Sequence, residues 1–177
     1  MLDTGALKEF LQQELPSNLD LLRQMVEINS FTANKDGVNK LGQLTAEAFA
    51  PLGFEPDFVP SVRADYGNHL VMTRKGTSGK VIGLISHLDT VFPPEEEIKN
   101  NFHWRVAGEK IYGPGTEDIK GGTTMIHLLL TALRKFAPNV FEQITWVILL
   151  NSSEEVTSHD FGKLCIERLG TDALAAL

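Results

Sequence analysis

Apolar residues recur along much of the chain at spacings typical of helices. Residues 4–28 and 38–50 place them three and four positions apart, which predicts two amphipathic helices. We expect the first helix to break near Pro16 and to restart at Ser17, which with Asp20 resembles a capping box. Helical spacing returns in two later stretches, residues 123–138 and 159–169.

Strand patterns alternate with these helices. Residues 54–60 predict an edge strand, because Pro56 and Pro60 cannot donate to a ladder of hydrogen bonds. Residues 144–150 are almost continuously apolar, as in a central strand buried on both faces. Further strands are expected at residues 69–73 and 80–86, and a short hairpin at residues 104–107 and 110–112. This alternation predicts an α/β domain, in which ligands usually bind at the carboxyl ends of the strands.

Composition narrows the class of protein. The 177 residues are 42% apolar and 22% charged, values that suit a single globular domain with one core. A net charge of −7 argues against sequence-independent binding to nucleic acid, which needs a basic surface. The single cysteine, Cys165, excludes an internal disulfide and a cysteine-based zinc site, and it is compatible with a reducing compartment.

The sequence contains no feature typical of membrane insertion or secretion. No apolar run approaches the roughly 20 residues needed to span a bilayer. The first residues lack the basic start and apolar segment of a signal peptide. We therefore expect a cytoplasmic protein without a membrane partner.

One polar pair follows directly on a predicted strand. Residues 81–85 lead into His87 and Asp89, which point to the same side of an extended backbone because they are two positions apart. The carboxylate can orient the imidazole while the other ring nitrogen binds a metal. The pair can equally be a satisfied polar contact at the end of a strand.

Two more polar clusters occur where other elements meet. Asp118 lies in a glycine-rich loop before a predicted helix, and Glu154 and Glu155 follow the predicted central strand. Asp118 could simply cap the helix, and a glutamate pair is usually solvated. The glycines around Asp118 instead favour a backbone held in unusual dihedral angles or closely approached. They are Gly113, Gly115, Gly121 and Gly122.

Together, an imidazole and several carboxylates are a typical ligand set for zinc or a similar divalent ion. Glu154 and Glu155 are adjacent and therefore point to different places, so that one can bind metal while the other faces the attacking water. These residues predict a metal-assisted hydrolase. The remaining histidines are expected to pack or to lie at the surface: His69, His103, His127 and His159.

The three clusters match the motifs of a known family in order and spacing. They are His87-Leu-Asp89-Thr-Val, Gly113-Pro-Gly-Thr-Glu-Asp118-Ile-Lys-Gly-Gly122 and Glu154-Glu155. In these motifs the chain resembles the M20 metallopeptidases, which include carboxypeptidases and N-acyl-amino-acid deacylases. The resemblance implies a mixed, mostly parallel central sheet flanked by helices. It also implies hydrolysis of a peptide or N-acyl amide bond in a small substrate, and the first motif slightly favours the carboxypeptidase branch.

The resemblance also implies a role for each motif residue. His87 would bind one zinc ion and Asp89 would orient it. Asp118 would bridge two zinc ions and would be followed by a cis peptide bond. Glu154 would be the general base and Glu155 would bind the second ion. Co²⁺ or Mn²⁺ could replace Zn²⁺.

Two departures from the family pattern stand out. Ser153 replaces an acid before the glutamate pair, and Thr157-Ser158 replaces a Gly-Ser that the family favours. Family members are also much longer. We therefore expect residues 1–177 to be the N-terminal portion of one catalytic domain, without the lid or dimerisation domain and the C-terminal ligands. Such a piece would be inactive alone, could form a homodimer, or could act as a non-catalytic binding module.

Overall fold

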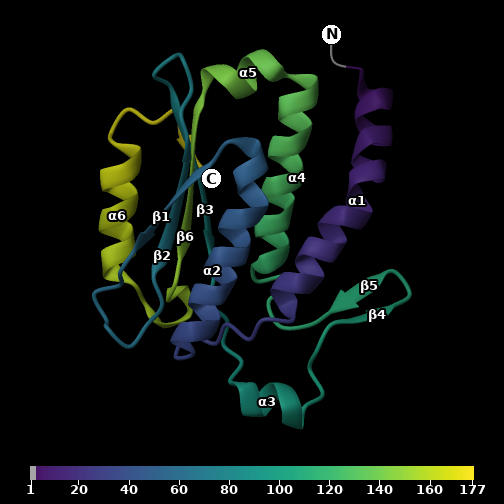
Figure 1. Ribbon diagram of the computed structural model, residues 1–177, viewed down its shortest axis with the longest axis vertical. Helices are drawn as coiled ribbons and strands as arrows, with labels where there is room; N and C mark the ends of the chain where they lie inside the picture. Colours follow the sequence, from purple (N-terminus) through teal and green to yellow (C-terminus); the bar gives the residue numbers. More distant parts are fainter. Residues whose placement is uncertain (1–2) are drawn as a thin grey trace.

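A five-stranded sheet lies between two layers of helices in the computed structural model, which describes residues 3–177 (Figure 1). Two helices, α2 (Lys35–Phe49) and α4 (Lys120–Phe136), cover one face of the sheet, and α1 (Thr4–Val26) packs on the outer side of α4. The other face is covered by α6 (His159–Leu169). Within residues 3–177, no helix is long and apolar enough to cross a membrane.

The sheet has the order β1-β2-β6-β3-β7. The central strand β6 (Thr145–Asn151) pairs parallel with β3 (Val81–His87) and antiparallel with β2 (His69–Arg74). At the edges, β1 (Glu55–Val59) pairs antiparallel with β2, and β7 (Ala175–Ala176) pairs parallel with β3. Four strands therefore run one way and β2 runs against them. The mixed, mostly parallel sheet, the edge strand and the central strand are all confirmed.

Alternation along β6 explains its apolar run. Neighbouring side chains of a strand point to opposite faces of the sheet, and both faces of β6 are covered by helices. Val147 and Leu149 pack in the cluster that includes Phe161 and Leu164 of α6. The alternate positions join the larger cluster beneath α1, α2 and α4, and they are Trp146, Ile148 and Leu150.

The first helix differs from the expectation, because it runs through Pro16 without a break. Ser17 does not cap a new helix, since its hydroxyl donates to the carbonyl of Glu14 at 2.8 Å. A proline in a helix interior removes one backbone hydrogen bond and costs about 3 kcal/mol. Burial of α1 side chains on both sides of the proline offsets that cost. These side chains are Phe10, Asn18, Leu22, Met25 and Val26.

The segments at the carboxyl ends of β3 and β6 gather at one end of the molecule (Figure 1). After β3 the chain forms the short helix α3 (Pro94–Lys99), and then the hairpin of β4 (Arg105–Ala107) and β5 (Lys110–Tyr112) that the sequence predicts. After β6 it forms a 3₁₀ turn, Glu154–Val156. At the opposite end, a 3₁₀ turn (Ala50–Leu52) follows α2 and α5 (Pro138–Gln143) precedes β6.

Candidate metal centre

Three of the motif residues converge at this end of the sheet. His87, Asp118 and Glu155 each offer one ligand atom, and these atoms all lie within 4.8 Å of one another. His87 ends β3, whose last residue pairs with Asn151 at the end of the neighbouring strand β6. The segments that follow two adjacent parallel strands must start side by side, and this places the glutamate pair beside His87. We call these three residues the metal cluster.

His87 is buried, and both of its ring nitrogens face oxygen atoms. Nδ1 lies 2.9 Å from the backbone carbonyl of Asp89, and Nε2 lies 3.0 Å from Oδ1 of Asp118. Burial alone would lower the pKa of His87, but hydrogen bonds with Asp89 and Asp118 raise it to about 9. With Nδ1–H directed at the Asp89 carbonyl, Nε2 is the nitrogen available to a metal. A divalent cation would compete with the proton that Nε2 carries.

The raised pKa of His87 predicts a pH-dependent stability of the metal-free protein. His87 titrates near 6.5 in the unfolded chain and near 9 in the folded one, so its contribution is complete below pH 6.5 and is lost as pH rises to 9. The full shift would be worth about 3 kcal/mol. Asp118 is solvent-exposed, so screening reduces the expected loss to about 1–2 kcal/mol.

Urea unfolding in EDTA, at several pH values across this interval, measures the effect. The variant His87→Gln should lack this part of the pH dependence. An identical pH dependence in the variant and the wild type would contradict the prediction.

Asp89 contacts both His87 and the backbone of the glutamate pair. Its carboxylate lies 3.5 Å from Nδ1 of His87, and the shorter contact to that ring comes from the backbone carbonyl. Oδ1 accepts the N–H of Glu154 at 2.9 Å. Oδ2 accepts the hydroxyl of Thr32 at 2.7 Å and the N–H of Glu155 at 3.2 Å. The buried carboxylate therefore holds the glutamate pair in place beside His87.

Thr32 has no role in the sequence-based prediction. It lies in a polar segment that reads only as a loop. The structure brings this segment beside the end of β3, where Thr90 donates to the carbonyl of Ser30 at 2.9 Å and Thr32 donates to the carbonyl of Thr90 at 3.2 Å. Nothing in the local sequence predicts this pairing, because the partners are almost sixty positions apart.

The loop before α4 has the unusual backbone that its glycines predict. Gly115 has a φ of +74°, and a Cβ on Gly121 would lie 2.3 Å from the carbonyl oxygen of Thr116. The peptide bond Asp118–Ile119 is cis, as the resemblance implies. The reading of Asp118 as a helix cap is wrong, since Ile119 occupies the N-cap position and no side chain caps α4. The Asp118 carboxylate is free to face His87.

Lys120 is a second residue that the sequence-based prediction left without a role. It is buried, and its ammonium donates to the carbonyl of Ile28 at 3.0 Å. Burial lowers its pKa to about 8, although the charge of Glu97 opposes this shift. Lys120 fastens the loop that carries Asp118 to the end of α1. The sequence feature that could have indicated a role for Lys120 is its position among the glycines of the second motif.

Comparison with known proteins agrees with this geometry. The profile of the peptidase family M20/M25/M40 matches residues 83–176, more than half of the chain. The chain belongs to peptidase family M20. Carboxypeptidase G2 of a Pseudomonas species is 33% identical over 142 residues, which are 80% of this chain and 33% of that relative. A succinyl-diaminopimelate desuccinylase of Thioalkalivibrio sulfidiphilus is 28% identical over 143 residues, 80% of this chain and 36% of the relative.

Solved structures of M20 members share the fold. Human carnosine dipeptidase 1 superposes with a TM-score of 0.77 at 14% identity, over 96% of this chain and 39% of that chain. An M20 metallo-carboxypeptidase of Sulfolobus solfataricus gives a TM-score of 0.67 at 15% identity, over 88% and 35% of the two chains. The chain spans about a third of the length of the curated relatives it matches.

A second polar network, centred on the buried His69, joins residues on either side of the glutamate pair in the sequence, Ser152 and Asp160. His69 is packed, as expected, and its Nδ1 lies 3.1 Å from both the N–H and the hydroxyl of Ser152. Because Ser152 donates to Nδ1, Nε2 carries the proton and donates to Asp160 at 3.0 Å. Burial would raise the pKa of Asp160, but hydrogen bonds from Val62, His69 and Ser158 hold it well below its usual range. Of the other histidines, His127 is half-buried against Asn18, and His103 and His159 are exposed.

The departure at Thr157 coincides with a strained backbone. Thr157 has a φ of +80°, a conformation that a β-branched residue adopts rarely and at a cost. Ser153, the other departure, is buried and donates its N–H to the Asn151 side chain at 3.0 Å. The glycine that M20 members favour near this position would fit the backbone of Thr157 without strain.

Thr157→Gly is therefore expected to raise the free energy of unfolding by about 1 kcal/mol. Urea unfolding of the metal-free protein measures the change. Thr157→Ala is the matched control and should recover little of it, because alanine also disfavours positive φ. Equal stability of the glycine and alanine variants would rule out backbone strain as the cause.

Proposed function

We propose that this chain carries metal-binding and catalytic residues of a zinc-dependent hydrolase that cleaves a peptide or N-acyl amide bond. The observation that carries the proposal is the convergence of the metal cluster at the carboxyl ends of β3 and β6. Membership of family M20 supports it, as does the similarity to both a carboxypeptidase and a desuccinylase. The higher identity to the carboxypeptidase favours a peptidase, with an N-acyl-amino-acid deacylase as the alternative.

The donor atoms of the cluster fit the proposed metal. One imidazole nitrogen and two carboxylates, without sulfur, suit Zn²⁺ and also Co²⁺ or Mn²⁺. We assign His87 to one ion, Glu155 to a second, and Asp118 to both. Bound metal would supply Lewis-acid chemistry, polarising a carbonyl group and acidifying a water molecule.

Glu154 is the proposed general base. Its carboxylate is exposed, lies 3.9 Å from Nε2 of His87, and stays outside the tighter metal cluster. The backbone N–H of Glu154 donates to Asp89, and this hydrogen bond fixes the position of the Glu154 backbone at the edge of the site. From there it can accept a proton from the attacking water and deliver it to the leaving amine. Asp89 thereby acts as a positioning residue for Glu154 and Glu155.

The cluster offers three protein ligands for the two proposed ions. A tetrahedral zinc site ordinarily uses three or four ligands for each ion, so we propose that metal binds weakly to residues 1–177 alone. Hydrolysis by this chain would then be slow or absent. We propose that it forms the N-terminal portion of one M20 catalytic domain, which agrees with the third of the relatives' length that it spans.

Calorimetric titration with Zn²⁺ tests the site. The wild-type chain should bind zinc, and the double variant His87→Ala/Asp118→Ala should bind it roughly 100-fold more weakly. The matched control removes an exposed histidine and an exposed aspartate elsewhere, His103→Ala/Asp172→Ala, and should bind like the wild type. Equal zinc affinity in the wild type and the first double variant would refute the proposed site.

A further inference from the structure

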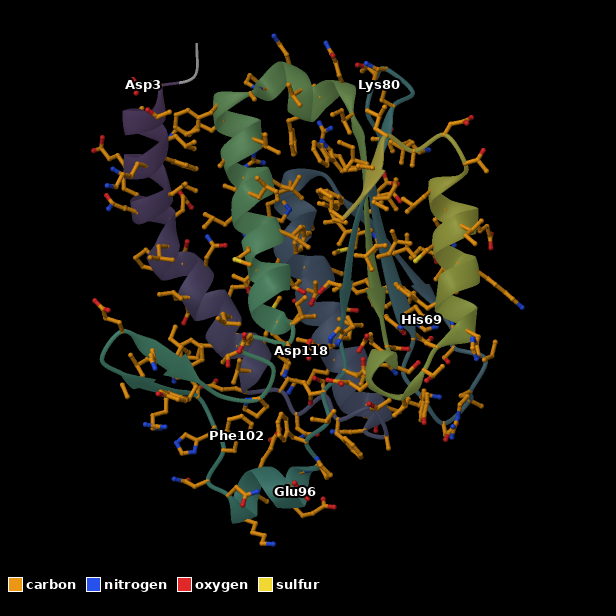
Figure 2. The ribbon with its side chains drawn as sticks, turned by 180° about the vertical axis from the view of Figure 1, so that it is seen from behind. Asp3, His69, Lys80, Glu96, Phe102 and Asp118 are labelled. Carbon is orange, nitrogen blue, oxygen red and sulfur yellow. The ribbon has the colours of Figure 1, made fainter. Side chains whose placement is uncertain are left out.

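A cavity of about 380 Å³ opens directly beside the metal cluster. Asp118 and Glu155 line one part of it, and three apolar side chains, Val91, Phe92 and Phe102, line another. Figure 2 shows Phe102 and Asp118 at the same end of the molecule, with α3 and its Glu96 beyond them. The remaining lining residues are Gly113, Gly115, Thr116 and Glu117.

The two phenyl rings form a preorganised apolar surface. Phe92 and Phe102 pack edge to face, with ring centroids 4.8 Å apart and planes at 77°. They stand immediately before and after the segment that contains α3, so this short helix brings them together. Asn29 donates to the carbonyl of Phe92 at 3.0 Å, and the N–H of Phe102 donates to the carbonyl of Glu97 at 2.9 Å.

Part of this apolar surface remains open to the cavity. Both phenyl rings are only half-buried, and Val91 is 50% exposed. Exposed apolar side chains that gather in a concave site beside polar groups are typical of a ligand pocket. A ligand group that covered them would remove their apolar surface from water.

The charges around the cavity restrict that group further. Among the described residues that line it, every charged side chain is acidic: Glu117, Asp118 and Glu155. In the metal-free chain, a carboxylate entering this space would meet three acidic side chains without a lysine or arginine to pair with it, and Glu117, which is assigned to no metal, would still face it when ions are bound. An uncharged apolar group meets no such penalty.

We propose that Phe92, Phe102 and Val91, which we call the apolar wall, bind an uncharged apolar side chain of the substrate, preferably an aromatic one, next to the bond that is cleaved. An amide carbonyl polarised by metal held at Asp118 and Glu155 would have its neighbouring side chain within reach of this same cavity. The assignment to a substrate rests on the proposed function. The affinity of the wall for an aromatic group does not, since it requires no metal.

Amide chemical shifts of the ¹⁵N-labelled, metal-free chain test the wall directly. The probes are N-acetylphenylalanine amide, N-acetylglycine amide and N-acetylglutamate, followed at Gly113, Gly115 and Thr116. The phenylalanine probe should bind roughly tenfold more tightly than the glycine probe, as expected for added aromatic contacts. The glutamate probe should bind more weakly than the phenylalanine probe by at least as much.

Variants separate the wall from other surfaces. Phe92→Ala and Phe102→Ala should each remove most of the preference for phenylalanine, and Phe102→Leu should keep part of it in a folded chain. Ile98→Ala is the matched control, because Ile98 is 82% exposed on α3 and does not line the cavity. It should keep the full preference.

The zinc titration on the same proteins distinguishes the two proposals. Two results would contradict the proposed apolar wall even if zinc binds at the metal cluster. One is a preference for the phenylalanine probe that persists in both alanine variants, and the other is binding of the glutamate probe as tight as that of the phenylalanine probe. A phenylalanine preference that depends on both rings supports the wall. If zinc then fails to bind the wild type, the proposed function fails and the wall stands as an aromatic binding site.

Discussion

Glu155→Gln is expected to weaken zinc binding roughly 100-fold, as for loss of a metal ligand, whereas Glu154→Gln should change it less than about twofold. The two residues are chemically identical neighbours, but only Glu155 places a carboxylate oxygen in the metal cluster. Burial raises the pKa of Glu155, with a further contribution from Asp118 and opposition from His87. A bound cation would stabilise its charged form.

Competition with a chromophoric chelator measures both zinc affinities under the same conditions. For the rate of hydrolysis, the replacement of Glu154 should have a large effect although it leaves zinc affinity almost unchanged. In any zinc-loaded preparation with measurable turnover, Glu154→Gln should lower the rate by about 10²–10⁴-fold, as for loss of a general base. If Glu154→Gln instead loses as much zinc affinity as Glu155→Gln, Glu154 is a ligand, and its contact at 3.9 Å from His87 would account for that.

Asp89→Asn is expected to lower the free energy of unfolding of the metal-free protein by about 3 kcal/mol. The buried carboxylate accepts hydrogen bonds from Thr32, Glu154 and Glu155. An asparagine offers one oxygen and one NH₂ group, so at least one of these donors would face another donor. Burial would raise the pKa of Asp89, but its bonds to His87 and to these donors lower it, so the site favours the charged form.

Urea unfolding measures this loss, and two other positions calibrate it. Thr32→Val removes one donor and should cost about 1 kcal/mol, while Thr32→Ser should remain close to the wild type. Asp65→Asn breaks an exposed ion pair with Arg63 and should leave the free energy of unfolding almost unchanged. A cost for Asp89→Asn no larger than that for Asp65→Asn would show that the buried carboxylate does not hold the glutamate pair.

Most elements of the fold could be predicted from local pattern alone. The apolar run of residues 144–150 became the central strand because both faces of β6 are covered, and the prolines of residues 54–60 confined that strand to an edge. Pro16 was misread because the rule for proline describes an isolated helix. In this chain, contacts with α4 across that proline stabilise a continuous α1.

The candidate site was also predictable from the sequence only in part. Sequence alone determined which chemical groups could form it, because His87, Asp118 and Glu155 each stand where a strand ends or a glycine-rich loop precedes a helix. The order of adjacent parallel strands then brings such ends together, which is a general property of α/β sheets.

Only the tertiary structure decided which residues support these groups. Thr32 reaches Asp89 across 57 positions, and His69 reaches Asp160 across 91. Phe92 and Phe102 are closer in sequence, but they meet only because α3 folds between them. Such contacts cannot be predicted from the periodicity of a sequence. The spacing of apolar side chains shows which face of a helix or strand is buried, but not which distant residue packs against it. The sequence therefore predicted the candidate ligand residues, whereas the side chains that hold them and the apolar wall could be identified only in the tertiary structure.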